Sequence, residues 1–134
     1  MNQAPFFSVR VIDSTHGCPE IPIVEGEGSA RVVLSPHNGG QFRSFQLIEL
    51  QHQARTISLR HGSDCVYYVM NGAGCIIDLA DQSRIDLVEG HMVHIDAGDC
   101  YRIEAGDAGL KVVGGPCPPD PDLYAGMTST GARS

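Results

Sequence analysis

The fold is decided by residues 59–74, which read LRHGSDCVYYVMNGAG. Residues 66–70 are rich in β-branched and aromatic side chains, a composition typical of a β-strand. Asn71-Gly72 follows at once and favours a type I′ hairpin turn, because that turn needs a positive φ at both central residues. The stretch therefore predicts the end of one strand, a short link, a second strand and a tight turn.

The polar residues of this stretch alternate with apolar ones. Because successive side chains of a strand point to opposite faces, Cys65 and Tyr67 share one face of the second strand. Leu59 and His61 share a face of the first strand for the same reason. If these faces point into a barrel they form a site; if they point outward they are a solvated sheet surface.

Short apolar runs continue on both sides of this stretch, at a spacing of about ten residues and separated by glycine-rich turns. No window of helical length shows a 3.6-residue period. The pattern predicts an all-β chain, an antiparallel barrel or sandwich. We expect strands at residues 6–12 (an edge strand), 30–34, 42–50, 54–61, 75–79, 84–88, 92–95, 100–103 and 110–113, with a turn at 104–109.

Composition limits the class of protein. A chain of 134 residues suits one domain, which we divide into an N-terminal edge strand and loop (1–25), a barrel (26–115) and a Pro- and Gly-rich tail (116–134). A net charge of −7 argues against nucleic acid and against an anionic membrane surface. Five cysteines without a CxxC pair, and no apparent signal peptide, lead us to expect free thiols and a cytoplasmic location.

Two groups of motifs carry a family resemblance. Residues 66–74, and then Gly90 followed by His94-Ile95 and residues 96–98, are similar to the two halves of a small single-domain cupin. Residues 28–34, Ser44-Phe45, residues 77–80 and Pro118 resemble the ectoine synthases within the cupins. The resemblance covers residues 26–119. It implies a cupin-type, jelly-roll-like antiparallel β-barrel and a homodimer.

Ectoine synthases are cyclising hydro-lyases that hold one iron ion through a Glu, a Tyr and a His. At the matching positions this chain has Cys65, Val93 and Tyr101, so none of the three ligands is retained. The wider cupin pattern of three His and one Glu falls on Leu59, His61, Cys65 and Tyr101. A substrate-pocket Arg of the family matches Arg31, and a neighbouring Trp is replaced by Glu27. We therefore expect the fold of the family without its iron chemistry, and no synthesis of ectoine.

The leading hypothesis is a lyase or cyclodehydratase that acts by acid–base chemistry on a small, carboxylate-bearing, amino-acid-derived substrate. His61 would be the base and Tyr101 the acid or oxyanion donor, since positioned groups of this kind accelerate reactions by about 10² to 10⁴-fold. Arg31 would bind the substrate carboxylate, and Cys65 and Tyr67 would line the pocket. This chemistry needs no cofactor.

Three alternatives remain open. A single iron or zinc ion could be held by His61, Cys65 and Tyr101. The chain could bind a small molecule without turnover. Cys65 could be a nucleophile with His61 as its base, or a buried and inert thiol. Tyr68, on the opposite face from Tyr67, would pack under a second subunit.

Overall fold

The computed structural model describes residues 9–128, which form eight antiparallel strands and no α-helix. No helix in this range is long and apolar enough to cross a membrane. The strands are β1 (Val24–Glu25), β2 (Gly28–Leu34), β3 (Phe45–Leu50), β4 (Arg55–Thr56), β5 (Cys65–Asp78), β6 (Ser83–Val88), β7 (Met92–Ile95) and β8 (Tyr101–Pro116); two 3₁₀ turns are η2 (Pro36–Asn38) and η3 (Pro121–Tyr124).

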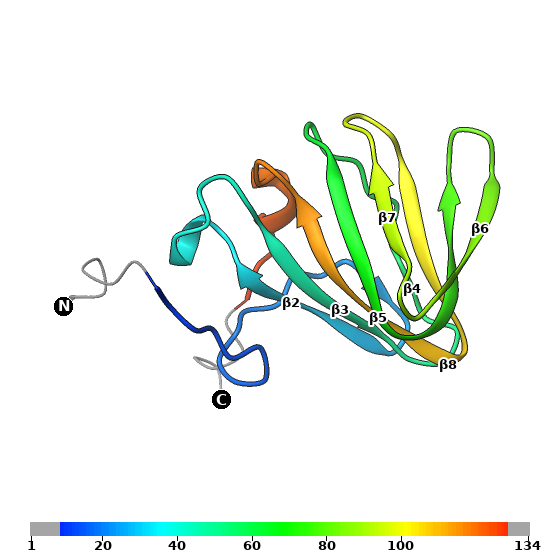
Figure 1. Cartoon of the computed structure of the whole chain (residues 1–134), viewed down its shortest axis with the longest axis horizontal. Coiled ribbons are helices and arrows are strands. Elements are labelled where there is room, and N and C mark those ends of the chain that lie inside the picture. Colours follow the sequence, from blue (N-terminus) through cyan, green and yellow to red (C-terminus); the bar gives the residue numbers. More distant parts are fainter. Residues whose placement is uncertain (1–8, 129–134) are drawn as a thin grey trace.

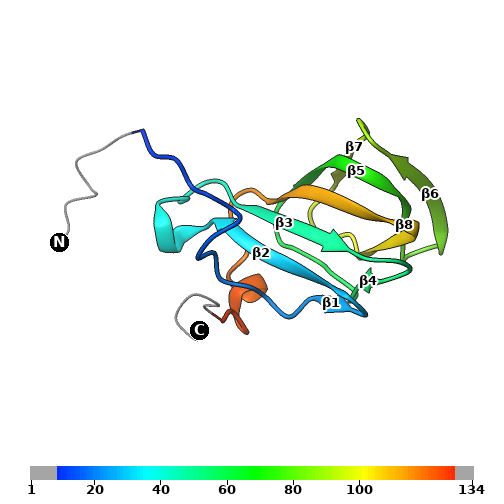
Figure 2. The same ribbon diagram turned by 90° about the horizontal axis from the view of Figure 1, so that it is seen from below.

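Two long strands, β5 and β8, pair along most of their length and belong to both layers of a nearly closed barrel (Figure 1). The first layer has the order β7-β5-β8-β3-β2 and uses the first half of β5. The second layer has the order β6-β5-β8-β4-β1 and uses the second half of β5. Figure 2 shows the same two layers curving around a common interior. Strand side chains that alternate inward fill this interior with an apolar core.

The prediction of a hairpin turn at Asn71-Gly72 is wrong, because β5 continues through these two residues. The pairing of β5 with β8 shifts register between Val69 and Asn71 and again between Gly72 and Gly74. Gly72 has φ +86°, so its positive φ serves a bulge that bends the strand from one layer into the other. The prediction of a turn at 104–109 is likewise wrong, because these residues lie inside β8. Pairing between distant strands overrides these local turn signals.

The N-terminal edge strand that the sequence predicts at residues 6–12 does not form in its described part, residues 9–12. Residues 9–12 are in no strand, and residues 6–8 lie outside the described residues. Val9 is 84% exposed and Val11 is 94% exposed, so neither side chain of this arm is buried (blue in Figure 1). β-Propensity alone does not hold a strand that lacks a pairing partner.

The C-terminal segment packs against the barrel. Glu20 and Thr128 form two backbone hydrogen bonds of 2.7 and 2.8 Å, and the Ser63 hydroxyl donates to the Pro118 carbonyl at 2.6 Å. Leu123, in η3, is buried with the core. These contacts bring residues 118–128 back over the end of the barrel where β5 begins.

The outer surface of the first layer carries Tyr68, as the alternation predicts. Its cross-strand neighbours are Met92 on β7 and Val113 on β8. Tyr68 is 43% exposed and Met92 is 68% exposed. A homodimer that covers this face stays a prediction.

Candidate functional site

Four polar side chains meet between the two layers, at the end of the barrel opposite the bend in β5. The Tyr101 hydroxyl, on the first residue of β8, lies 2.7 Å from His61 Nε2 and 2.7 Å from the Tyr67 hydroxyl. The Cys65 sulfur is 3.7 Å from the same hydroxyl. Cys65 and Tyr67 share a face of the first half of β5, as the alternation predicts, and the four residues expected from the resemblance to cupins meet here. Each is at most 4% exposed.

A fifth residue, Asp120, completes this cluster and was not predicted. Its Oδ2 lies 2.7 Å from His61 Nδ1, and it comes from the segment that folds back over the barrel. The sequence gives one local signal for Asp120: it precedes a proline and caps η3, where its other carboxylate oxygen accepts from the Asp122 amide. That signal does not reveal a histidine partner 59 residues away.

The direction of the hydrogen bonds follows from the groups involved. An ionised Asp120 can only accept, so the bonded His61 Nδ1 carries a proton. In a neutral imidazole, Nε2 then accepts from the Tyr101 hydroxyl, whose oxygen in turn accepts from Tyr67. The cluster is therefore an ordered chain from Tyr67 through Tyr101 and His61 to Asp120.

Burial sets the protonation of the two phenols. Removal from water raises the pKa of Tyr101 far above its ordinary value, and the neighbouring Tyr67 and Cys65 raise it further. Burial also raises the pKa of Tyr67 well above its ordinary value. Both tyrosines are neutral hydroxyl donors at physiological pH.

Cys65 is expected to be unreactive. Burial raises the pKa of its thiol to about 11, and the effect of the neighbouring Tyr101 and Tyr67 hydroxyls, which lowers it, is smaller. At pH 7 the thiolate fraction would be about 10⁻⁴, and the residue is 1% exposed. We expect iodoacetamide to alkylate the exposed Cys117 at least about 100-fold faster than Cys65, as measured by peptide mass spectrometry. Equal rates at neutral pH would support the nucleophile hypothesis instead.

The cluster adjoins two small cavities. A cavity of about 220 Å³ reaches His61 and Asp120 between residues 57–61 and the returning C-terminal segment. A second, of about 100 Å³, reaches Tyr101 between the layers. The sequence predicts that these four side chains line an open cavity, whereas in the structure they contact one another. The larger cavity is lined by Pro22, Ile23, Ile57, Ser58, Leu59, Arg60, His61, Asp120, Asp122, Leu123 and Gly126.

Arg31 does not join the cluster, contrary to expectation. Its neighbours Ala30 and Val32 point into the core, so Arg31 points outward from β2. Its guanidinium lies 3.3 Å from Glu49 and donates to the Ser14 carbonyl at 3.1 Å. The arginine that lines the cavity next to His61 is Arg60, an exposed residue.

The positions of the family's metal ligands do not suit a metal ion. Leu59 and Val93 have no donor atom, and both ring nitrogens of His61 already make 2.7 Å hydrogen bonds.

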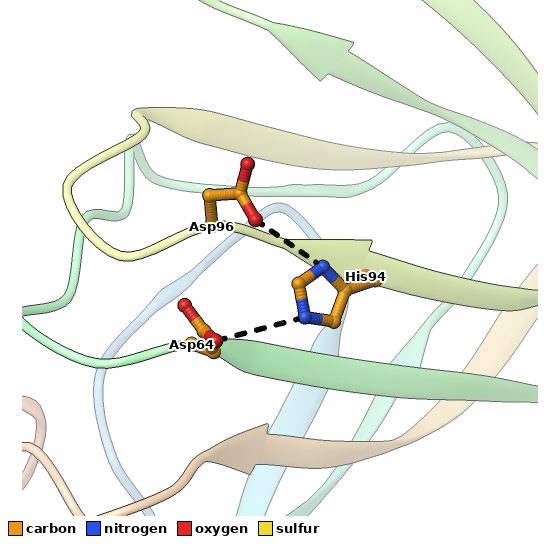
Figure 3. Close-up of side chains that lie close together, drawn as sticks. All are labelled: Asp64, His94 and Asp96. Atoms are coloured by element: carbon orange, nitrogen blue, oxygen red, sulfur yellow. Dashed lines mark ion pairs between the residues drawn. The ribbon is translucent and has the colours of Figure 1, made fainter.

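Outside the barrel, residues 9–128 bring together one group of three possible metal ligands: Asp64, His94 and Asp96 (Figure 3). His94 Nε2 is 3.8 Å from Asp64 Oδ2, and His94 Nδ1 is 3.5 Å from Asp96 Oδ1. All three are exposed. A single iron or zinc ion stays a prediction, and this surface group would be separate from the cluster.

Comparison with solved structures identifies the fold. The polyketide cyclase RemF from Streptomyces resistomycificus aligns with TM-score 0.71 and 13% identity, over 91% of this chain and 85% of its own. A predicted oxalate decarboxylase from Thermotoga maritima aligns with TM-score 0.68 and 22% identity, over 81% and 98%. A cupin-like protein from the same organism aligns with TM-score 0.66 and 17% identity, over 81% and 80%. The chain therefore has a cupin fold, as predicted.

No protein-family model and no curated protein match the chain in sequence. The finer likeness to ectoine synthases stays a prediction.

Proposed function

We propose that this cupin-fold chain is a lyase or cyclodehydratase that removes water from a small carboxylate-bearing, amino-acid-derived substrate by acid–base chemistry. The observation that carries the proposal is the ordered chain Tyr67–Tyr101–His61–Asp120 beside a cavity of about 220 Å³. That volume is below the range of about 300–1,000 Å³ found for drug-sized ligands, so the substrate is small. Arg60 takes the carboxylate-binding role expected for Arg31.

The chain of hydrogen bonds couples the base to the acid. The leaving hydroxyl of a bound substrate accepts the Tyr101 O–H in place of His61 Nε2, which leaves the Nε2 lone pair free to take the proton from the substrate carbon, and Asp120 stabilises the imidazolium. Nε2–H then donates to Tyr101, which frees the Tyr101 proton for the departing hydroxyl. That hydroxyl leaves as water, and the Nε2 proton moves to Tyr101. The C–H and C–O bonds break, one π bond forms (a ring bond in a cyclisation), and His61 returns to its neutral form.

One comparison supports the cyclisation in this proposal, because RemF, a protein of similar fold, is named a polyketide cyclase. The almost complete burial of the four side chains favours the second candidate, a cupin that binds a small molecule without turnover. The two candidates differ in whether a bound substrate exchanges protons.

The test is a panel of small hydroxy and acylamino carboxylic acids incubated with the protein in D₂O. We expect one class to lose 18 Da by mass spectrometry or to gain deuterium at carbon by NMR. His61→Ala should lower the rate at least about 100-fold, because it removes the base. His37→Ala, which replaces an exposed histidine of η2, should not lower it. Binding without loss of water or exchange would favour the second candidate, and full activity of His61→Ala would remove this residue from the mechanism.

A further inference from the structure

A groove of about 680 Å³ lies on the outer surface of the first layer, away from the cluster at His61. It runs between the N-terminal arm (residues 9–12) and the segment that joins β2 to β3. Its volume falls within the range typical of small-molecule sites. Its apolar lining is Ile12, Val33, Leu34, Phe42, Phe45 and Val113.

A β-bulge exposes this apolar lining. The pairing of β2 with β3 is irregular between Val32 and Leu34, so Leu34 does not continue the inward alternation of Ala30 and Val32. Leu34 is paired with Phe45, which is 39% exposed. Phe42 is 74% exposed. The bulge therefore adds consecutive side chains, Val33 and Leu34, to one apolar surface.

The charge of the groove is opposite to that of the chain. Two arginines, Arg10 and Arg43, line it, and no Asp or Glu does, although the net charge of the chain is −7. Within residues 9–128 neither arginine makes an ion pair, whereas Arg31 and Arg55 pair with glutamates. The Arg10 guanidinium lies so close to Gly39 that a Cβ there would overlap it, so the arm rests against the loop.

An anion with an aliphatic tail satisfies both properties of the groove. Its tail would bury apolar surface at about 25 cal/mol per Å² and its carboxylate could form bidentate hydrogen bonds with a guanidinium. A second copy of the chain, related by a twofold axis through the groove, would bring the arginines toward their own copies, and like charges in an interface are unfavourable. Nucleic acid needs a larger basic surface.

We propose that this groove binds a single-chain amphipathic carboxylate, with the aliphatic tail on Phe42, Phe45 and Val33 and the carboxylate on Arg10 and Arg43. The site is independent of the cluster at His61 and of the reaction proposed there.

The test compares three probes that each carry a ten-carbon chain, decanoate, decanol and decyltrimethylammonium, each kept below the concentration at which it aggregates or separates from solution. Calorimetry and NMR titration of the whole chain should show that decanoate binds most tightly and shifts the signals of Phe42 and Val33. Arg43→Gln, alone and with Arg10→Gln, should weaken decanoate about fivefold per arginine and leave decanol unchanged. Arg84→Gln, on β6, is the matched control and should have no effect.

Three results would overturn the proposal. Decanol could bind as tightly as decanoate, or Arg43→Gln could leave decanoate binding unchanged. The groove signals could also shift with protein concentration and not with decanoate, together with a dimer mass, which would make a second copy the occupant. Since none of these results involves His61, the proposed reaction is tested separately.

Discussion

Tyr101→Phe is expected to destabilise the chain and to abolish most of its activity. The substitution removes one oxygen and leaves two partners, the Tyr67 hydroxyl and His61 Nε2, buried without their hydrogen bonds. Since each buried unsatisfied group costs about 1–3 kcal/mol, we expect the free energy of unfolding to fall by about 2–4 kcal/mol. Turnover should fall about 10² to 10⁴-fold, because the proton of the leaving group passes through this hydroxyl.

Tyr68→Phe is the matched control for this variant. Tyr68 is on the same sheet, is 43% exposed and makes no side-chain hydrogen bond within residues 9–128. Urea unfolding of the two variants measures the difference directly. If both unfold at the same urea concentration, the hydroxyl of Tyr101 does not have the role that we assign to it.

Gly72→Ala should have the largest effect on stability. Gly72 has φ +86°, and a Cβ there would overlap the carbonyl oxygen of Gly109 in the adjacent strand. The positive φ alone costs an alanine about 1–3 kcal/mol, and the overlap adds a cost typical of overpacking. We expect a loss of about 3 kcal/mol or more, which is a large part of the stability of a domain of this size. Thermal unfolding followed by circular dichroism is the measurement.

Gly90→Ala separates the two contributions. Gly90 has a similar φ of +95°, but a Cβ there would meet no atom within 4 Å. It should therefore show only the cost of the positive φ, about 1–3 kcal/mol, without the added cost of the overlap. Equal losses in the two variants would mean that the close approach of β5 to β8 at Gly72 is unimportant.

The period of two accounts for only part of the candidate site. Tyr67 and Cys65 share a face of β5 because they are two residues apart. The strand expected at 54–61 forms only at Arg55–Thr56, so the inward position of His61 follows from the resemblance to cupins and not from the period. A strand has few ways to orient such residues once one of its faces is buried. An antiparallel barrel or sandwich could be predicted from the many short alternating segments, whereas the cupin fold was expected from the resemblance of residues 66–74, Gly90 and residues 94–98 to that family.

Interactions between distant segments could not be predicted. Asn71-Gly72 is a strong local turn signal, yet pairing with β8 converts it into a bulge. Asp120 reaches His61 only because the C-terminal segment folds back. Arg31 matched a position in a family motif, but its side chain faces away from the cluster. In each case the deciding contact joins residues that sequence spacing does not relate.

The two layers of the barrel share the bend in β5 at one end, while at the other the hydrogen bond between Tyr67 and Tyr101 spans the interior from one layer to the other. At this end the two layers are therefore joined by a side-chain hydrogen bond. A molecule that binds the Tyr101 hydroxyl in place of Tyr67 would break this hydrogen bond between the layers as it occupies the site.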